Sequence, residues 1–491
     1  MADSLLRLGA PLLLLLAGCA SGPDYRAPAT PAAAAGSFVT QSARFQEAPL
    51  PDDWWRLYDD PALTALIGQA FAANADLRQA QANLARARAV YDEARTGQWP
   101  ATQAGGGAQY GRDQTAWSGS GQAPTQWSYS GGLQITYEVD LYGRVRRDIE
   151  AAHYDAESMA AARDAVRVAV AAETTRAYVD ACALGEAIDV AQASAALAAR
   201  NLRLVEQRLQ AGAAARLDVE RAAASAARAR AAVPPLHGQR QAALFELAAL
   251  TGRPPAEAPA EAAQCRRAPA PAAALPVGDG AALLRRRPDL RQAERTLAAD
   301  TARIGVAVAD LYPRITLGAS ADYLRNDQLR GGRTWSFALG PLVSWEFPNI
   351  AAARSRVRQA RAQADASLAA FDAVVLRALK ETEQALAAYD AALAQRDELA
   401  QARERAGRAL ELAEQRYRAG AITYLDVLVA QGDFIDARAQ LADAERRAGA
   451  ERVAVFRSLG GGWQATDAAI SLAAGPARTA RTDPPSPSGR P

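Results

Sequence analysis

Two aspartates stand at matching places in a duplicated stretch of the chain. Residues 208–219 recur as residues 416–427, so Asp218 and Asp426 align 208 positions apart. A carboxylate can act as a functional charge, or it can accept hydrogen bonds at the start of a helix, where the helix dipole favours it. Each aspartate follows a glycine, Gly212 or Gly420, that ends a long helical stretch as a residue free to adopt a positive φ would. The pair is therefore the first candidate for function, with plain helix capping as the alternative.

The sequence lacks the parts of the common enzyme sites. His153 and His237 are the only histidines and lie far apart, with no Cys/His spacing for a metal. There is no P-loop, no G-x-S-x-G and no G-x-G-x-x-G after a strand. Lys plus Arg is 56 against Asp plus Glu 54, a net charge of +2, and the two signs are interleaved. This pattern does not favour a nucleic-acid surface.

The N-terminus predicts secretion and a lipid anchor. An apolar core at residues 12–16 is too short to span a bilayer and is typical of a secretory signal. The sequence Leu16-Ala17-Gly18-Cys19 resembles a bacterial lipobox, so we expect residues 1–18 to be the signal peptide and Cys19 to be acylated. Residues 19–60 then form a lipid-anchored, extended tether. The alternative is an ordinary signal peptide with an incidental cysteine.

The two other cysteines, Cys182 and Cys265, lie in a helical stretch and in a Pro/Ala linker. We expect them to be structural bystanders. A disulfide between them in an oxidising compartment is the alternative.

Two unbroken helical stretches dominate the chain, at about residues 144–210 and 351–419. At ~1.5 Å per residue each is on the order of 100 Å long, which no compact globule needs. Such helices must pair along their length, so the fold is mainly α and built as a rod or tube. The duplication divides the chain into a first repeat at 61–252, a linker at 253–280, a second repeat at 281–460 and a disordered tail at 461–491.

Each repeat also contains a β-hairpin, at 101–142 and 314–347. Apolar and polar residues alternate in both, and the apolar faces carry aromatics, as strands that face lipid do. Four strands cannot close a barrel, and open edges cannot lie in hydrocarbon. Strands from several chains would have to share one barrel, eight from two chains or twelve, with room for a pore, from three. A small soluble sheet is the alternative.

At this point the sequence resembles the TolC-type outer-membrane efflux factors, in their lipoprotein, NodT-like branch. The motifs that carry the resemblance are the lipobox with Gly22-Pro23-Asp24-Tyr25-Arg26-Ala27-Pro28, Trp54-Trp55, residues 287–294, residues 302–313 and the two Gly…Leu-Asp-Val repeats. The resemblance implies a homotrimer with a 12-stranded barrel in the outer membrane and a periplasmic tunnel of long helices. It further implies a passive exit duct without catalysis or cofactor, apart from the covalent lipid. The duct would receive cargo from an inner-membrane pump, of the resistance-nodulation-division type, through a periplasmic adaptor.

The resemblance assigns roles to the repeat ends. The periplasmic gate would comprise Asp218, Asp426, Leu425, Val429 and Tyr417. An adaptor would dock at the same tips, at Arg208, Gly212, Arg416 and Gly420. The chain departs from the family pattern because Val429 stands where relatives commonly have a second acid, and Ile422 where some have an arginine. We therefore expect a gate that relies on apolar contact, with at most one ring of equivalent carboxylates around the trimer.

Four acids fall on the polar strand faces and are predicted to line the pore: Glu138, Asp140, Asp322 and Glu346. Three other functions compete with the exit duct of an efflux pump. The same fold serves as the outer-membrane duct of type I protein secretion. A periplasmic adaptor lipoprotein would have one helical hairpin rather than two, and a structural coiled-coil lipoprotein would lack the strands.

Overall fold

The computed structural model describes residues 21–29, 34–112, 122–271, 274–348 and 350–463. The predicted signal peptide, Cys19 and the end of the tail lie outside these residues. The chain divides into two units. The first holds residues 78–163 and 288–379 with the N-terminal segment up to residue 34. The second holds the described residues of 35–77, 164–287 and 380–463.

Two long helices, α4 (Arg144–Gln210) and α10 (Ile350–Arg418), each contribute to both units. Their bounds are close to the ranges expected from the sequence. None of the described helices carries an apolar run long enough to cross a membrane. The chain is mainly helical with one small antiparallel sheet.

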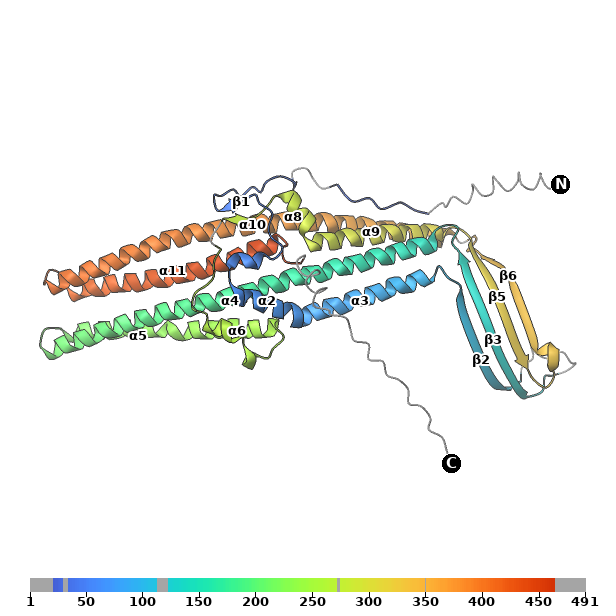
Figure 1. Cartoon of the computed structure of the whole chain (residues 1–491), viewed down its shortest axis with the longest axis horizontal. Coiled ribbons are helices and arrows are strands. Elements are labelled where there is room, and N and C mark those ends of the chain that lie inside the picture. Colours follow the sequence, from blue (N-terminus) through green and yellow to red (C-terminus); the bar gives the residue numbers. More distant parts are fainter. Residues whose placement is uncertain (1–20, 30–33, 113–121, 272–273, 349, 464–491) are drawn as a thin grey trace, which may run out of the picture. The chain divides into compact units, whose positions relative to one another are not determined.

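The sheet of the first unit has the order β2-β3-β5-β6, with every neighbouring pair antiparallel (Figure 1). The strands are Ala101–Gly111, Gln126–Val139, Arg314–Arg325 and Trp335–Ser344. The register pairs Leu133 with Ala321, and Ala321 with Phe337, so residues of one parity share one face. The predicted alternation is thereby confirmed as a real apolar face. Its exposed members include Trp127, Tyr129, Leu133, Leu317, Trp335, Phe337, Leu339 and Val343.

In addition to the sheet, the first unit contains most of α3 (Ala75–Thr96), all of α9 (Pro288–Ala309) and the adjoining parts of α4 and α10. A buried carboxylate on α9 ties this helix to α10. Asp300 accepts hydrogen bonds from Arg303 at 2.6 Å, from Gln363 at 3.2 Å and from Ser367. Hydrogen bonds from several donors offset the cost of burying this charged group.

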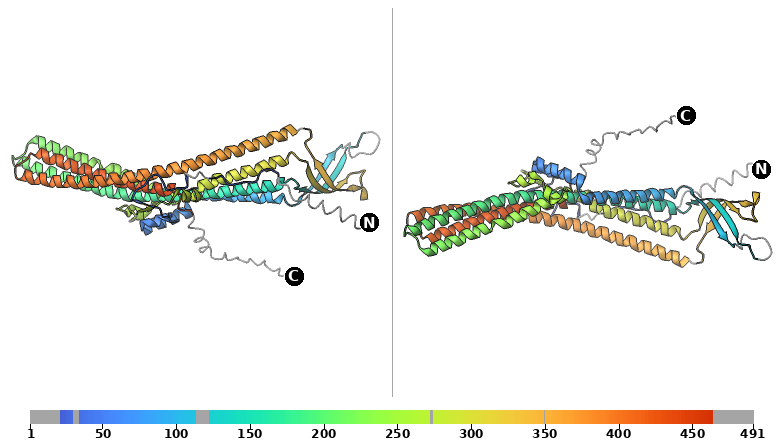
Figure 2. Two further views of the ribbon diagram at one scale, coloured as in Figure 1. Left: turned by 90° about the horizontal axis from the view of Figure 1, so that it is seen from above. Right: turned by 90° about the horizontal axis from the view of Figure 1, so that it is seen from below.

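In the second unit α5 (Arg216–Ala231) and α6 (Val233–Leu250) run beside α4, while α11 (Tyr424–Ser458) runs beside α10 (Figures 1 and 2). Pro234 and Pro235 lie in the first turn of α6, where proline is tolerated. The short elements of this unit are η2 (Trp54–Tyr58), α2 (Pro61–Ala73), η3 (Pro255–Glu257), α7 (Ala260–Gln264) and α8 (Gly280–Arg286), with β1 (Phe45–Gln46) parallel to β4 (Leu275–Pro276).

An aromatic cluster forms the core of the second unit. Trp54 is fully buried and stacks on Phe456 with 4.6 Å between ring centroids. The indole of Trp54 donates to the carbonyl of Gly461 at 3.2 Å. The Trp-Trp motif before the first helix therefore packs against the end of the last one.

One expectation about the second unit is wrong. Cys182 and Cys265 are not bystanders, because they form a disulfide with 4.9 Å between Cα atoms. The stretch predicted to be a plain Pro/Ala linker is folded onto α4 at this point.

Candidate functional site

The two repeat tips, residues 208–219 and 416–427, have the same backbone conformation at the turn. Gly212 and Gly420 both adopt left-handed conformations, at φ +75° and +71°. In each tip the amide after the glycine donates to the carbonyl five residues earlier, at 2.8 and 2.9 Å. The glycine's own amide donates to the carbonyl three residues earlier, at 2.9 and 3.0 Å. This is the Schellman ending of a helix, which requires a residue without Cβ strain at positive φ.

The candidate aspartates both accept from the residue that precedes the next helix. The Asp426 carboxylate accepts from the Thr423 amide at 2.8 Å and from its hydroxyl at 2.7 Å. The Asp218 carboxylate accepts a single hydrogen bond from the described residues, from the Ala215 amide at 3.3 Å. The hydrogen bonds from Thr423 lower the pKa of Asp426 below its usual value. Both aspartates cap helices, and the cap at Asp426 has more and shorter hydrogen bonds than the cap at Asp218.

The two tips of the chain pack together through a shared apolar core. Its buried residues come from four helices: Val205, Ala222, Leu410, Tyr424 and Val427. The partly buried Ile422 and Tyr417 pack against this core. Ile422 therefore serves the contact between the tips.

Tyr417 is the centre of an interaction between the tips. The Arg208 guanidinium lies over its ring, 4.6 Å from the centroid, and the ring of Tyr424 is 5.6 Å away. A cation over an aromatic face is attracted by the ring's negative potential. The Tyr424 hydroxyl is buried and finds no hydrogen-bond partner among the described residues. Its burial, with the nearby Tyr417 and Asp218, raises the pKa of Tyr424.

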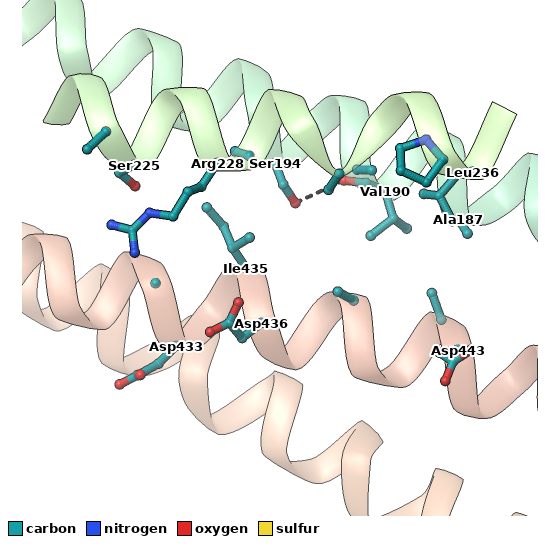
Figure 3. Close-up of a pocket in the computed structure, with 18 of the residues that line it drawn as sticks. Ala187, Val190, Ser194, Ser225, Arg228, Leu236, Asp433, Ile435, Asp436 and Asp443 are labelled. Carbon is teal, nitrogen blue, oxygen red and sulfur yellow. Dashed lines mark hydrogen bonds between the residues drawn. The ribbon is translucent and has the colours of Figure 1, made fainter. Parts of the chain in front are cut away.

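Leu425 and Val429 do not join this core. The two residues are 45% and 54% exposed, and both line a groove of about 760 Å³. One wall of the groove comes from α4, α5 and α6, and the other comes from α11 (Figure 3). Residues with charge gather along it, and these are Arg221, Arg228, Asp433, Asp436, Asp443 and Arg446.

Sequence reasoning missed this groove. In Figure 3 Arg228 extends from α5 toward the α11 wall, which carries Asp433 and Asp436. A signal was available, because Arg221 is the repeat counterpart of Val429, 208 residues earlier, and both line the groove. Extending the repeat alignment past the Leu-Asp-Val motif would have found the pair.

Three of the four predicted pore acids lie at the strand ends and contact arginines. Glu138 accepts two hydrogen bonds from Arg144, at 2.6 and 2.7 Å. Asp140 lies beyond β3 and accepts from the first amides of α4, both at 3.0 Å. Glu346 lies beyond β6 and pairs with Arg356 at 2.8 Å.

Asp322 is the fourth and lies within the sheet. The register pairs it with Gly132 on one side and Ser336 on the other. A Cβ at Gly132 would come within 2.8 Å of the Asp322 carboxylate, so the glycine makes room for this charge. The role of all four acids in lining a pore stays a prediction. Among the described residues no cluster of three metal-binding side chains occurs.

The chain matches known proteins over nearly its whole length. The model of the family "Outer membrane efflux protein" matches residues 66–253 and 281–461. Nodulation protein T of Rhizobium leguminosarum bv. viciae is 30% identical over 463 residues, 94% of each chain. The antibiotic efflux pump outer membrane protein ArpC of Pseudomonas putida is 31% identical over 94% of this chain and 96% of its own.

A solved structure shows the same fold. The outer-membrane channel OprN superposes with a TM-score of 0.84 at 35% identity, over 91% of this chain and all of its own. The family model matches the chain in two segments, separated by residues 254–280. The chain belongs to the outer membrane efflux protein family.

Proposed function

We propose that the chain is the exit duct of a tripartite efflux pump and passively exports toxic small molecules when docked to an adaptor and an inner-membrane transporter. Family membership over both repeats carries this proposal. Members of this family are channels rather than enzymes. Relatives are described as antibiotic and toluene efflux components, which supports small toxic compounds as the cargo class.

Deletion of the gene followed by a panel of toxicity assays tests this function. Sensitivity to several antibiotics or solvents, restored by the wild-type gene, is expected. Loss of secretion of a protein, with unchanged resistance, would instead favour a type I secretion duct.

The duct is proposed to be a homotrimer with a shared twelve-stranded barrel. The strand order leaves β2 and β6 as the edges of the sheet, and their unpaired N–H and C=O groups cannot face hydrocarbon. Three copies would pair these edges and leave a lumen. Native mass spectrometry in detergent tests the stoichiometry, and a stable monomer or dimer would overturn it.

A lipid on Cys19 would anchor the chain in the outer membrane, with the helical hairpins in the periplasm. The support lies in residues 21–25. The Ser21 amide donates to the Tyr142 carbonyl at 3.2 Å, and Arg147 pairs with Asp24 at 2.6 Å. Residues 21 and 24, which follow closely on Cys19 in the sequence, are thereby held beside the end of β3 and the start of α4. Mass spectrometry of the N-terminal peptide tests the acylation.

The gate is proposed at the tips, with Asp218, Asp426, Leu425, Val429 and Tyr417 at the periplasmic end of the duct. The capping bonds of the aspartates and the exposed apolar pair Leu425 and Val429 support a gate that depends mainly on apolar contact. Asp426→Ala alone should then open the duct only modestly. Single-channel conductance of the purified trimer tests this, and a several-fold increase would contradict it.

The adaptor is proposed to dock on the tips at Arg208, Gly212, Arg416 and Gly420, and to lay a helix along the groove. Its apolar wall and its charges of both signs suit an amphipathic helical hairpin. A photo-crosslinking residue at Leu425 should capture the adaptor. The same residue at Leu412, which is exposed but outside the groove, is the matched control.

The four acids at the sheet are proposed to line the pore. Glu138, Asp140 and Glu346 each have a neighbouring arginine, so Asp322 would supply most of the uncompensated charge. Asp322→Asn should therefore reduce cation preference more than Glu346→Gln. Reversal potentials in a salt gradient measure the difference.

A further inference from the structure

The linker between the repeats is attached to the middle of α4 by a disulfide and by hydrogen bonds around it. Cys182 is fully buried in α4, and Cys265 follows directly after α7. Their Cα atoms are 4.9 Å apart and their sulfurs are bonded. This separation lies in the range that a disulfide bridges without backbone movement.

Neighbouring residues fit the linker to α4 around this bond. A Cβ at Gly185, one turn after Cys182, would come within 2.6 Å of the Cys265 carbonyl oxygen, so only glycine allows this approach. The Arg240 guanidinium of α6 donates to the carbonyls of Ala263 and Cys265, both at 2.7 Å. It also donates to the carbonyl of Ala181 at 3.1 Å. Three elements therefore converge on the pair.

The second repeat fastens a different segment at the equivalent place, without a covalent bond. Asp390 is the counterpart of Cys182, 208 residues later, and accepts from Ser42 at 2.7 Å and from Arg44 at 3.0 Å. The next attachment is also matched. Arg266 pairs with Asp189 at 3.1 Å, and Arg44 pairs with Asp397, its repeat counterpart, at 2.9 Å.

These positions are thus attachment points for a connecting segment in both repeats. In the second repeat the attachment is an ion pair at a partly exposed surface, which is individually weak. In the first repeat it is covalent, and it closes a loop of sequence separation 83 that contains the first tip, α5 and α6.

We propose that this protein is a substrate for disulfide formation, and that the Cys182–Cys265 bond holds the linker on α4 and closes the base of the first hairpin. A disulfide of an oxidising protein is the co-reactant. The Cys265 thiolate attacks one donor sulfur and releases the first donor thiol. The Cys182 thiolate then displaces the donor from this mixed disulfide. Two electrons pass to the donor, and the two protons end on its thiols.

The inference rests on the proposed function only for the compartment, because disulfides persist outside the cytosol. Its test does not use transport activity. Full-length protein is purified from the membrane under thiol-blocking conditions, unfolded, digested without reductant and analysed by mass spectrometry. A linked peptide pair containing Cys182 and Cys265 is expected. Alkylated Cys182 and Cys265 in that sample would overturn the proposal.

Limited trypsin digestion tests the fastening role. Cleavage after Arg266 or Arg267 should be about tenfold faster or more in Cys182→Ser/Cys265→Ser than in the wild type, because the linker opens more often. Wild-type protein reduced after folding gives the same comparison if the variant does not accumulate. Equal cleavage rates before and after loss of the bond would overturn the role.

Arg240→Gln is the matched control for the Cys182→Ser/Cys265→Ser variant. It keeps the disulfide while removing the three hydrogen bonds, so its cleavage rate should lie between those of the wild type and the double variant. A rate equal to that of the double variant would assign the fastening to Arg240 instead of the disulfide.

Discussion

The two repeat tips share a backbone and differ in what their side chains do. Gly212 and Gly420 make the same left-handed turn with the same two backbone hydrogen bonds. After the turn, the first tip begins its helix with exposed residues and a single long capping bond. The second begins with a fully hydrogen-bonded cap and buries Tyr424 and Val427. Duplication has therefore preserved the fold of the tip while its chemistry has diverged.

The divergence makes the tips complementary rather than equivalent. The second tip supplies the aromatic Tyr417, and the first supplies the Arg208 that lies over it. At the groove, the first tip presents Arg221 where the second presents Val429. Substitutions at matched positions should thus have unequal effects where side chains differ and equal effects where only the turn is involved.

The largest difference is expected for Tyr424 and its counterpart Arg216. Tyr424 is 6% exposed in the shared core, whereas Arg216 is exposed. Removing a buried aromatic ring costs about 3–5 kcal/mol, and a surface change costs within about 0.5 kcal/mol. Hydrogen–deuterium exchange of the full-length protein in detergent should show faster opening of both tips in Tyr424→Ala and little change in Arg216→Ala.

Tyr424→Phe is the control for this prediction. The Tyr424 hydroxyl has no partner among the described residues, so its removal should leave tip protection unchanged or raise it. A loss in Tyr424→Phe as large as in Tyr424→Ala would mean that the hydroxyl, and not the ring, holds the tips together.

The glycines should give equal effects. Alanine at either Gly212 or Gly420 must adopt a positive φ, which costs roughly 1–2 kcal/mol. Open space surrounds both positions, so no contact adds to this cost. Exchange rates at each tip should rise by similar factors in Gly212→Ala and Gly420→Ala, and a clear inequality would show that the two turns are not equivalent.

Arg208 and Arg416 should differ by a smaller amount. Arg208→Gln removes a cation from the Tyr417 ring and should destabilise the contact between tips by about 0.5–1 kcal/mol. Arg416 is exposed, and its Arg416→Gln change should alter tip opening by less than about 0.5 kcal/mol. Arg208→Lys, which keeps the positive charge, should retain part of the stabilisation by this contact. Equal loss in both glutamine variants would exclude the cation–aromatic contact.

The sequence predicted the long helices, the strand parity and the two tips, because these depend on local periodicity and on glycine. It did not predict contacts between distant segments. Cys182 and Cys265 meet where Gly185 leaves room for the linker to approach α4. Asp140 and Glu346 continue the alternating pattern of their strands, yet the sheet ends at Val139 and Ser344. Asp140 instead caps α4, and that role is set by where the helix begins.

The smallest effect is expected for the two aspartates of the repeat tips, Asp218 and Asp426. Asp426 has a lowered pKa because Thr423 donates two hydrogen bonds to its carboxylate. A depressed pKa means that the cap is stabilising above the unfolded value of about 3.9 and that the contribution is lost as the pH falls through the folded pKa. Exchange protection of the second tip should decline with acid in the wild type, and Asp426→Asn should remove about twofold of protection at neutral pH. Asp218→Asn should do less at the first tip, since Asp218 has a single bond of 3.3 Å. If Asp426→Asn kept the acid-dependent loss of protection, another group would titrate there and the two caps would no longer account for the difference between the tips.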